Sequence, residues 1–139
     1  MQESAERKKR SFVVMDIVLI VLSAAFLIGL FTFLGACGAK DDGSWMTCHW
    51  AGQALKGVAA MCLLLSLVHL VIGKPAKQGA DLGLIALCIL AVWIPGHLIG
   101  LCMMDTMRCR AVMQPGCLIF AALIAIAALI DMLFARKSD

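Results

Sequence analysis

Residues 12–34, FVVMDIVLIVLSAAFLIGLFTFL, decide the fold, because the only ionisable side chain in this run is Asp16. The hydrocarbon core of a bilayer is crossed by about 20 helical residues, and a backbone in lipid must satisfy its hydrogen bonds within its own segment. The run therefore predicts a membrane-spanning helix. It follows the basic block RKKR at 7–10 and is longer than the apolar part of a secretion signal, so we expect an uncleaved first helix.

Three further apolar runs, at about 51–72, 82–104 and 117–135, predict three more spans. The composition agrees, since 63% of the 139 residues are hydrophobic and 15% are charged, with a mean hydropathy of +0.97. A soluble domain of this size needs a more polar surface. We predict an all-α membrane protein with one transmembrane domain over residues 1–139, four helices, and two outer loops at about 35–52 and 101–116.

The basic residues predict the orientation of these helices. With the N-terminus in the cytoplasm, eight of the twelve lysines and arginines lie on the inner side. Four lie on the outer side: Lys40, Lys56, Arg108 and Arg110. Because lysine and arginine are enriched in cytoplasmic segments, we expect both termini in the cytoplasm. The net charge of +3 follows from this topology and gives no reason to expect a nucleic-acid partner.

The two outer loops share a spacing. GACGAKDDGSWMTCHWAGQ at 35–53 and GLCMMDTMRCRAVMQ at 100–114 each contain Gly-x-Cys, then Met-x-Cys, then a glutamine five residues after the second cysteine. The shared frame predicts two helical hairpins related by a pseudo-twofold axis along the membrane normal. Such an axis would gather four cysteines at the outer face: Cys37, Cys48, Cys102 and Cys109.

These four cysteines admit structural disulfides or thiol redox chemistry. Two bridges in short outer loops suit an oxidising compartment, in any of three pairings. The overall plan also resembles that of DsbB-type and vitamin K epoxide reductase-type oxidases, which pass electrons from disulfides to a quinone. His49 beside Cys48 and Arg110 beside Cys109 are candidates to stabilise a thiolate. The spacings C-x10-C and C-x6-C differ from the C-x-x-C pair of those enzymes, so we favour structural bridges.

Soft-metal binding is a third interpretation of the outer loops. Thiolates and thioethers favour Cu(I), although methionine at an interface more often serves packing. The candidate ligands besides the cysteines are His49, Met46, Met103, Met104 and Met107.

Three ionisable residues inside the apolar runs lie near the inner ends of helices: Asp16, His69 and Asp131. We expect them to anchor the helices at the interface, paired with bases of the tails and inner loop such as Arg10, Lys74 or Arg136. His97 differs, because it follows Pro95 in WIPGHLIG. A proline can free a backbone carbonyl, so His97 either bonds at a helix kink or faces the bundle interior as a candidate site residue.

CHWAGQA at 48–54, followed by Gly-x-Cys at 100–102, Met-x-Cys-Arg at 107–110 and Pro115, is similar to a family of small bacterial four-helix membrane proteins catalogued as a domain of unknown function. The similarity covers nearly the whole chain. Genes of that family often stand beside those for MacB-like ABC transporters, and the family supplies no catalytic residue.

The resemblance implies a non-enzymatic protein of the bacterial inner membrane. It would be an accessory subunit of a MacB-like transport system, in contact with the permease or with a second copy of itself, and would need no cofactor. An outer-face protein that carries out thiol redox chemistry with a quinone, or binds copper, is the alternative. Either protein has the lipid bilayer as its first partner.

Overall fold

The computed structural model describes residues 2–34, 42–44, 47–100 and 109–137. These residues form α1 (Gln2–Phe31), α2 (Thr47–His69), α3 (Lys74–Trp93) and α4 (Gln114–Lys137), with one π-helical turn, η1 (Cys109–Met113), before α4. All four α-helices are long and apolar enough to cross a membrane, and the described part of the chain has no strand. The predicted all-α, four-span architecture is therefore confirmed.

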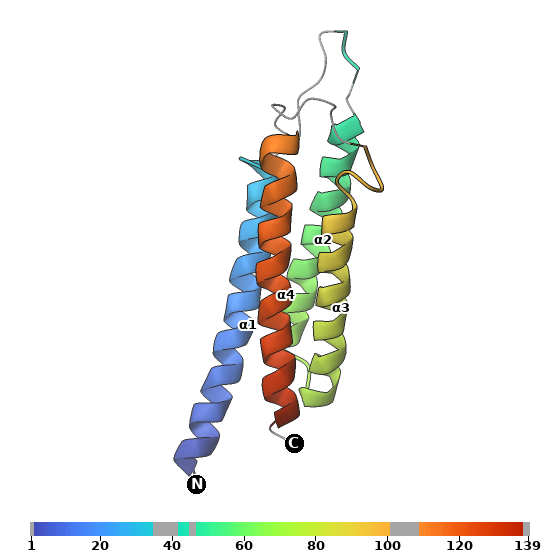
Figure 1. Ribbon diagram of the computed structural model, residues 1–139. Coiled ribbons are helices and arrows are strands. Elements are labelled where there is room, and N and C mark those ends of the chain that lie inside the picture. The colour runs from blue at the N-terminus through green and yellow to red at the C-terminus, as the bar shows by residue number, and fades with distance from the viewer. Residues whose placement is uncertain (1, 35–41, 45–46, 101–108, 138–139) are drawn as a thin grey trace.

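The helices run antiparallel in chain order, so the first and last described residues lie at the same end of the bundle (Figure 1). We call this the terminal end, and the opposite end the loop end. Helix α1 packs mainly on α2, and α3 on α4, while α2–α3 and α1–α4 contacts close the ring. Each predicted hairpin is thus a packed pair. The pseudo-twofold relation between the two pairs stays a prediction.

Helix α3 spans a different range from the predicted 82–104. It begins at Lys74 because proline is tolerated in the first turn of a helix, where Pro75 lies. It ends at Trp93, before Pro95. Gly96 then adopts φ +95°, and its N–H donates to the carbonyl of Ile99 at 3.0 Å, so the chain turns.

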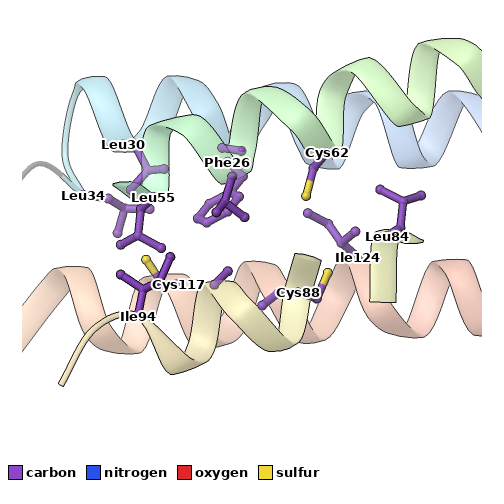
Figure 2. Packing of buried hydrophobic residues seen from close by; sticks show 14 of the residues in the cluster. Phe26, Leu30, Leu34, Leu55, Cys62, Leu84, Cys88, Ile94, Cys117 and Ile124 are labelled. Atoms are coloured by element: carbon purple, nitrogen blue, oxygen red, sulfur yellow. The ribbon is translucent and has the colours of Figure 1, made fainter. Parts of the chain in front are cut away.

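The core lies along the axis of the bundle (Figure 2). The rings of Phe26 and Phe120 stack with centroids 5.5 Å apart. The inward face of α4 is mostly small, as the AALIAIAA pattern at 121–128 suggests: Ala121 and Ala128 are buried there beside the larger Ile124, which suits close helix packing. The outward positions of all four helices carry large apolar side chains, which suits contact with lipid.

Candidate functional site

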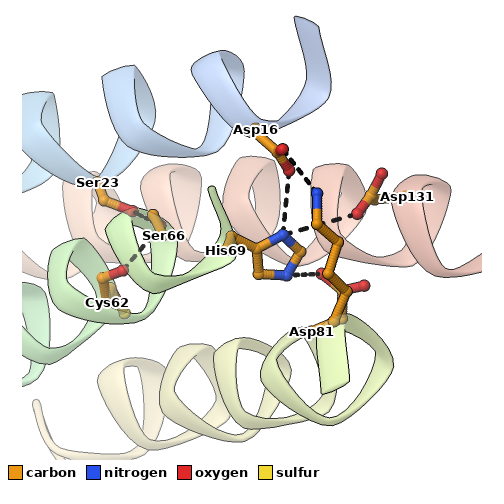
Figure 3. A network of polar contacts seen from close by, with 8 residues as sticks. Asp16, Ser23, Cys62, Ser66, His69, Asp81 and Asp131 are labelled. Atoms are coloured by element: carbon orange, nitrogen blue, oxygen red, sulfur yellow. Dashed lines mark hydrogen bonds and ion pairs between the residues drawn. The ribbon is translucent and has the colours of Figure 1, made fainter. Parts of the chain in front are cut away.

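Five ionisable side chains, contributed by all four α-helices, converge inside the terminal end of the bundle (Figure 3). Four of them have no more than 2% of their surface exposed, and the fifth, a lysine, has a side chain that is 15% exposed. We call this group the ionisable centre. Its members are Asp16 of α1, His69 of α2, Lys77 and Asp81 of α3, and Asp131 of α4.

The imidazole of His69 is the middle of the ionisable centre. Its Nδ1 lies 3.1 Å from Asp16 Oδ1 and 3.9 Å from Asp131 Oδ2. Its Nε2 lies 2.9 Å from Asp81 Oδ1. The ammonium group of Lys77 donates to the second oxygen of Asp16, with Nζ 2.7 Å from Oδ2. One ring thus links the carboxylates of three different helices.

Two of the three carboxylates have no hydrogen-bond donor within the described part of the chain. Both oxygens of Asp81 and both oxygens of Asp131 are buried, and no described residue donates a hydrogen bond to them. The close approach of His69 Nε2 to Asp81 lacks hydrogen-bond geometry, so Nε2 has no hydrogen-bond partner among the described residues either. Buried polar atoms without partners are rare and costly, which marks these oxygens as available ligands.

The charges of the ionisable centre do not balance. Three carboxylates face one ammonium group and one imidazole. With a protonated imidazole, ionised carboxylates leave an excess of one negative charge, and with a neutral imidazole the excess is two. Because an uncompensated buried charge costs several kcal/mol, this arrangement favours the uptake of a positive ion.

Two grooves lead from the terminal end toward the ionisable centre. One, of about 860 Å³, lies between α1 and the end of α4, and the residues that line it include Arg7, Arg10 and Asp131. The other, of about 460 Å³, includes Asp16 and Lys77. The grooves therefore bring the surface of the terminal end close to the buried carboxylates. An ion that enters from this end need not cross the apolar core to reach them.

A stripe of polar groups continues from the ionisable centre into the bundle. Cys62, Ser66 and His69 follow one another at helical spacing, so they share the inward face of α2. The hydroxyl of Ser66 donates to the carbonyl of Cys62 at 2.8 Å and lies 3.1 Å from the Ser23 hydroxyl of α1 (Figure 3). Asp16 and Ser23, seven residues apart, likewise share the inward face of α1.

Asp16, His69 and Asp131 were expected to anchor the helices at the interface, paired with bases of the tails and inner loop; all three are instead buried between helices, facing one another. The pairing base is Lys77, bound to Asp16. Asp81 was not expected at the site, because the predicted third span begins at 82 and leaves it in the inner loop. Pro75 in a first helical turn is the signal that would have placed Asp81 inside a helix.

The candidates of the outer loops lie mostly outside the described residues. Those not described are Cys37, Cys102, Met46, Met103, Met104, Met107 and the side chain of Cys109. Cys48 is fully buried in the first turn of α2, and His49 Nε2 lies 3.4 Å from the amide nitrogen of Gln53. No disulfide joins two cysteines of the described part of the chain. The disulfide clamp, the Cu(I) site and the quinone chemistry stay predictions.

His97 and Arg110 lie near the loop end, away from the ionisable centre. His97 is exposed in the turn after Pro95, and its ring stacks on Trp93 with centroids 4.9 Å apart. The expectation that His97 bonds at a kink or faces the bundle interior is wrong, because α3 ends before the proline. Arg110 is exposed in η1.

Residues 19–134 match the family described as "Domain of unknown function (DUF4418)". The chain belongs to this family. The matched range includes every residue of the ionisable centre except Asp16. No curated protein and no solved structure matches the chain. Membership of an uncharacterised family, as the sequence motifs suggested, leaves the function to be argued from the geometry of the site.

Proposed function

We propose that this DUF4418 protein is a non-enzymatic, multi-pass protein of the bacterial inner membrane that binds a small inorganic cation at its ionisable centre. The observation that carries the proposal is the convergence of three buried carboxylates on one imidazole and one ammonium group. Ionisable residues within membrane spans are costly, and they commonly mark ion sites and pathways. The excess of negative charge selects a cation as the ligand.

The proposed side of entry is the cytoplasm. The terminal end carries most of the basic residues, including the block at 7–10, which supports its placement on the cytoplasmic side. The two grooves that approach Asp131 and Asp16 open at this end. Because the ionisable centre is built from all four helices, binding of the cation draws the helices together. A bound cation would thus set how tightly the terminal end is packed.

The experiment is thermal unfolding of the purified full-length chain after treatment with a chelator. Unfolding is followed in a fixed buffer with Na⁺, Mg²⁺, Ca²⁺, Mn²⁺ or Zn²⁺ added singly. A cation present at 100 times its Kd stabilises the folded state by about 2.7 kcal/mol, so the unfolding temperature is expected to rise with at least one cation.

Two variants separate the ionisable centre from the surface. Asp131→Asn is expected to lose the stabilisation, because it removes a carboxylate that faces His69. Asp42→Asn, at an exposed position near the loop end, is expected to keep it. The proposal fails if no cation raises the unfolding temperature, or if the rise is the same in wild type and Asp131→Asn.

We also propose that the protein is an accessory subunit of a MacB-like ABC transport system, as its family resemblance implies. The exposure of helix α3 supports a contact with a partner. Only 22% of its most apolar stretch is buried in the bundle, whereas 33% is buried in each of the other three helices. Leu82, Ile89 and Trp93 follow one exposed stripe along α3. We propose the transmembrane helices of the permease as the occupant of this stripe.

Co-purification from native membranes in mild detergent tests the accessory role. Wild type is expected to retain the MacB-like permease, and the pair Leu82→Ala and Ile89→Ala to lose it. The matched control is Val21→Ala with Ile28→Ala, two equally exposed positions at the same spacing on α1. Retention of no transporter subunit by wild type, or equal retention by both double variants, contradicts the accessory role.

A further inference from the structure

We propose that the cation of the ionisable centre is a divalent transition metal, bound by Asp16 Oδ1, His69 Nδ1 and Asp131 Oδ2. This inference rests on the proposed cation-binding function and names the ligands and the class of ion. The three donor atoms come from three helices and all lie within 4.8 Å of one another. All three residues are buried, unlike the exposed acidic groups that commonly cluster without a metal.

The separations of the donor atoms suit one ion. Bonds of about 2.0–2.2 Å to imidazole and carboxylate place the donors of a tetrahedral or octahedral ion about 3–4.4 Å apart. His69 Nδ1 lies 3.1 Å from the oxygen of Asp16 and 3.9 Å from that of Asp131. The carboxylate of Asp131 accepts no hydrogen bond from a described residue, so both of its lone-pair oxygens are available to the ion.

The residues behind the donors have the arrangement that supports metal ligands. His69 Nε2 lies 2.9 Å from Asp81 Oδ1, on the side of the ring away from Asp16 and Asp131, in a contact that lacks hydrogen-bond geometry in the cation-free protein. A ligating histidine usually donates its other ring N–H to a carboxylate, and Asp81 is the carboxylate placed to accept from Nε2 once the ion is bound. Lys77 holds the second oxygen of Asp16 at 2.7 Å, which orients the first oxygen toward Nδ1. Asp81 and Lys77 are thus positioning residues of the site.

Charge selects a divalent ion. To bind through Nδ1, His69 must be neutral, and the ionisable centre then carries two more negative than positive charges. A divalent ion together with Lys77 balances the three carboxylates. A monovalent ion leaves a buried negative charge, which the apolar surroundings disfavour.

The donor set selects the class of ion. Mg²⁺ and Ca²⁺ prefer all-oxygen sites, and Cu(I) prefers sulfur. Two carboxylate oxygens and one imidazole nitrogen suit Mn²⁺, Fe²⁺ or Zn²⁺. This site lies at the terminal end and is therefore separate from any copper site in the loops around His49.

The test is a Mn²⁺ titration of the chelator-treated full-length chain, with free Mn²⁺ measured by electron paramagnetic resonance. Wild type is expected to bind one Mn²⁺ per chain, and Zn²⁺ to displace it. Asp131→Asn and His69→Gln are expected to bind no Mn²⁺ in the range where wild type saturates. Asp81→Asn is expected to weaken binding roughly 10–100-fold, as loss of a carboxylate behind a ligand does.

Matched control variants accompany the test, and its outcomes distinguish failure of the metal site from failure of the cation-binding function. Asp42→Asn and His97→Gln remove the same chemical groups from exposed positions and are expected to bind like wild type. Circular dichroism shows which variants are folded. If His69→Gln does not fold, the isosteric variant Asp131→Asn alone decides the test. Equal Mn²⁺ binding by wild type and folded Asp131→Asn overturns the inference. If Na⁺ or Mg²⁺ alone stabilises wild type through Asp131, this inference fails while the proposed cation-binding function stands.

Discussion

Asp131 has the least support of the carboxylates in the ionisable centre. It is 1% exposed, accepts no hydrogen bond from a described residue, and its nearest cationic partner is His69 at 3.9 Å. Without a bound cation, its charge is offset among the described residues by no hydrogen bond and only by the distant imidazole. The residue therefore lowers the stability of the cation-free protein, which is expected where a site is kept for binding.

Asp131→Asn is accordingly expected to stabilise the chelator-treated protein by about 1–3 kcal/mol, because it removes a desolvated charge and adds an N–H donor for neighbouring oxygens. The measurement is the free energy of unfolding in mixed detergent, without added metal. In saturating Mn²⁺ the order is expected to reverse, with wild type the more stable. A loss of stability in the chelator-treated variant contradicts the assignment of Asp131 as an unsupported ligand.

The hydrogen bond between Ser23 and Ser66 is a second feature at the scale of single residues, and its donor can be assigned. Ser66 has one hydroxyl hydrogen, which it donates to the Cys62 carbonyl, so Ser23 must be the donor between the two hydroxyls. Hydrogen bonds of this kind between membrane helices contribute about 0.6 kcal/mol on average.

A double-mutant cycle with Ser23→Ala and Ser66→Ala is expected to give a coupling free energy of about 0.6 kcal/mol in favour of the pair. Ser11→Ala is the control, since the Ser11 hydroxyl donates only to the Arg7 carbonyl of its own helix at an exposed position. Strictly additive effects of the two core substitutions would show that the hydroxyls do not interact in the folded protein.

At the scale of the helix, Gly116 is where α4 meets the end of α1. A Cβ added there would overlap the side chain of Leu34, which is itself 2% exposed and has little room to move. Gly57 on α2 and Gly79 on α3 have nothing within 4 Å of the same position. The three glycines therefore share a helical backbone but differ in the room that each leaves for a side chain.

Gly116→Ala is expected to destabilise the protein by about 1–3 kcal/mol through overpacking. Gly57→Ala and Gly79→Ala are expected to change stability by less, and in the stabilising direction by about 0.4–1 kcal/mol, because alanine restricts the unfolded chain. Unfolding of the three variants in mixed detergent gives the comparison. Equal effects at Gly116 and Gly57 would mean that Leu34 yields without cost.

Sequence reasoning succeeded for the number of spans and failed for the ionisable centre, for one physical reason. Hydropathy is a property of consecutive residues, so the run 12–34 predicts a span by itself. The partners of His69 are set by how four helices are rotated against one another, which no single run contains. Asp81 shows the limit most clearly, because a span counted from 82 places it in a loop, while α3 begins at Lys74 and buries it.

The loop end illustrates a second limit. Cys48 and His49 are adjacent in sequence, but within the first turn of α2 they point in different directions, with Cys48 buried and His49 partly exposed. A motif read as letters does not separate these environments. Assigning each residue to a face of the helix does separate them, since consecutive helical residues are about 100° apart.

At the scale of the whole molecule, charge is distributed unevenly between the two ends. The terminal end holds the basic block at 7–10 and the end of α4 with Arg136 and Lys137. Near the loop end, Asp42 accepts hydrogen bonds from the N–H and the hydroxyl of Ser44, which hold the pKa of its carboxyl below the usual range. Asp42 therefore stays ionised at neutral pH, which adds negative charge at the loop end.

This asymmetry predicts that a fluorescent protein fused after the last residue fluoresces in the cytoplasm. A phosphatase that is active only outside the cytoplasm is expected to be active when it is inserted between Gly43 and Ser44. The reason is the retention of lysine and arginine on the cytoplasmic side during insertion. Replacing the four bases at 7–10 by glutamine removes half of the eight residues expected inside and leaves four on each side. That variant is expected to insert in both orientations, with reporter activity on both sides of the membrane. Wild-type activity of the phosphatase at the C-terminus would reverse the assigned orientation and place the ionisable centre at the outer face.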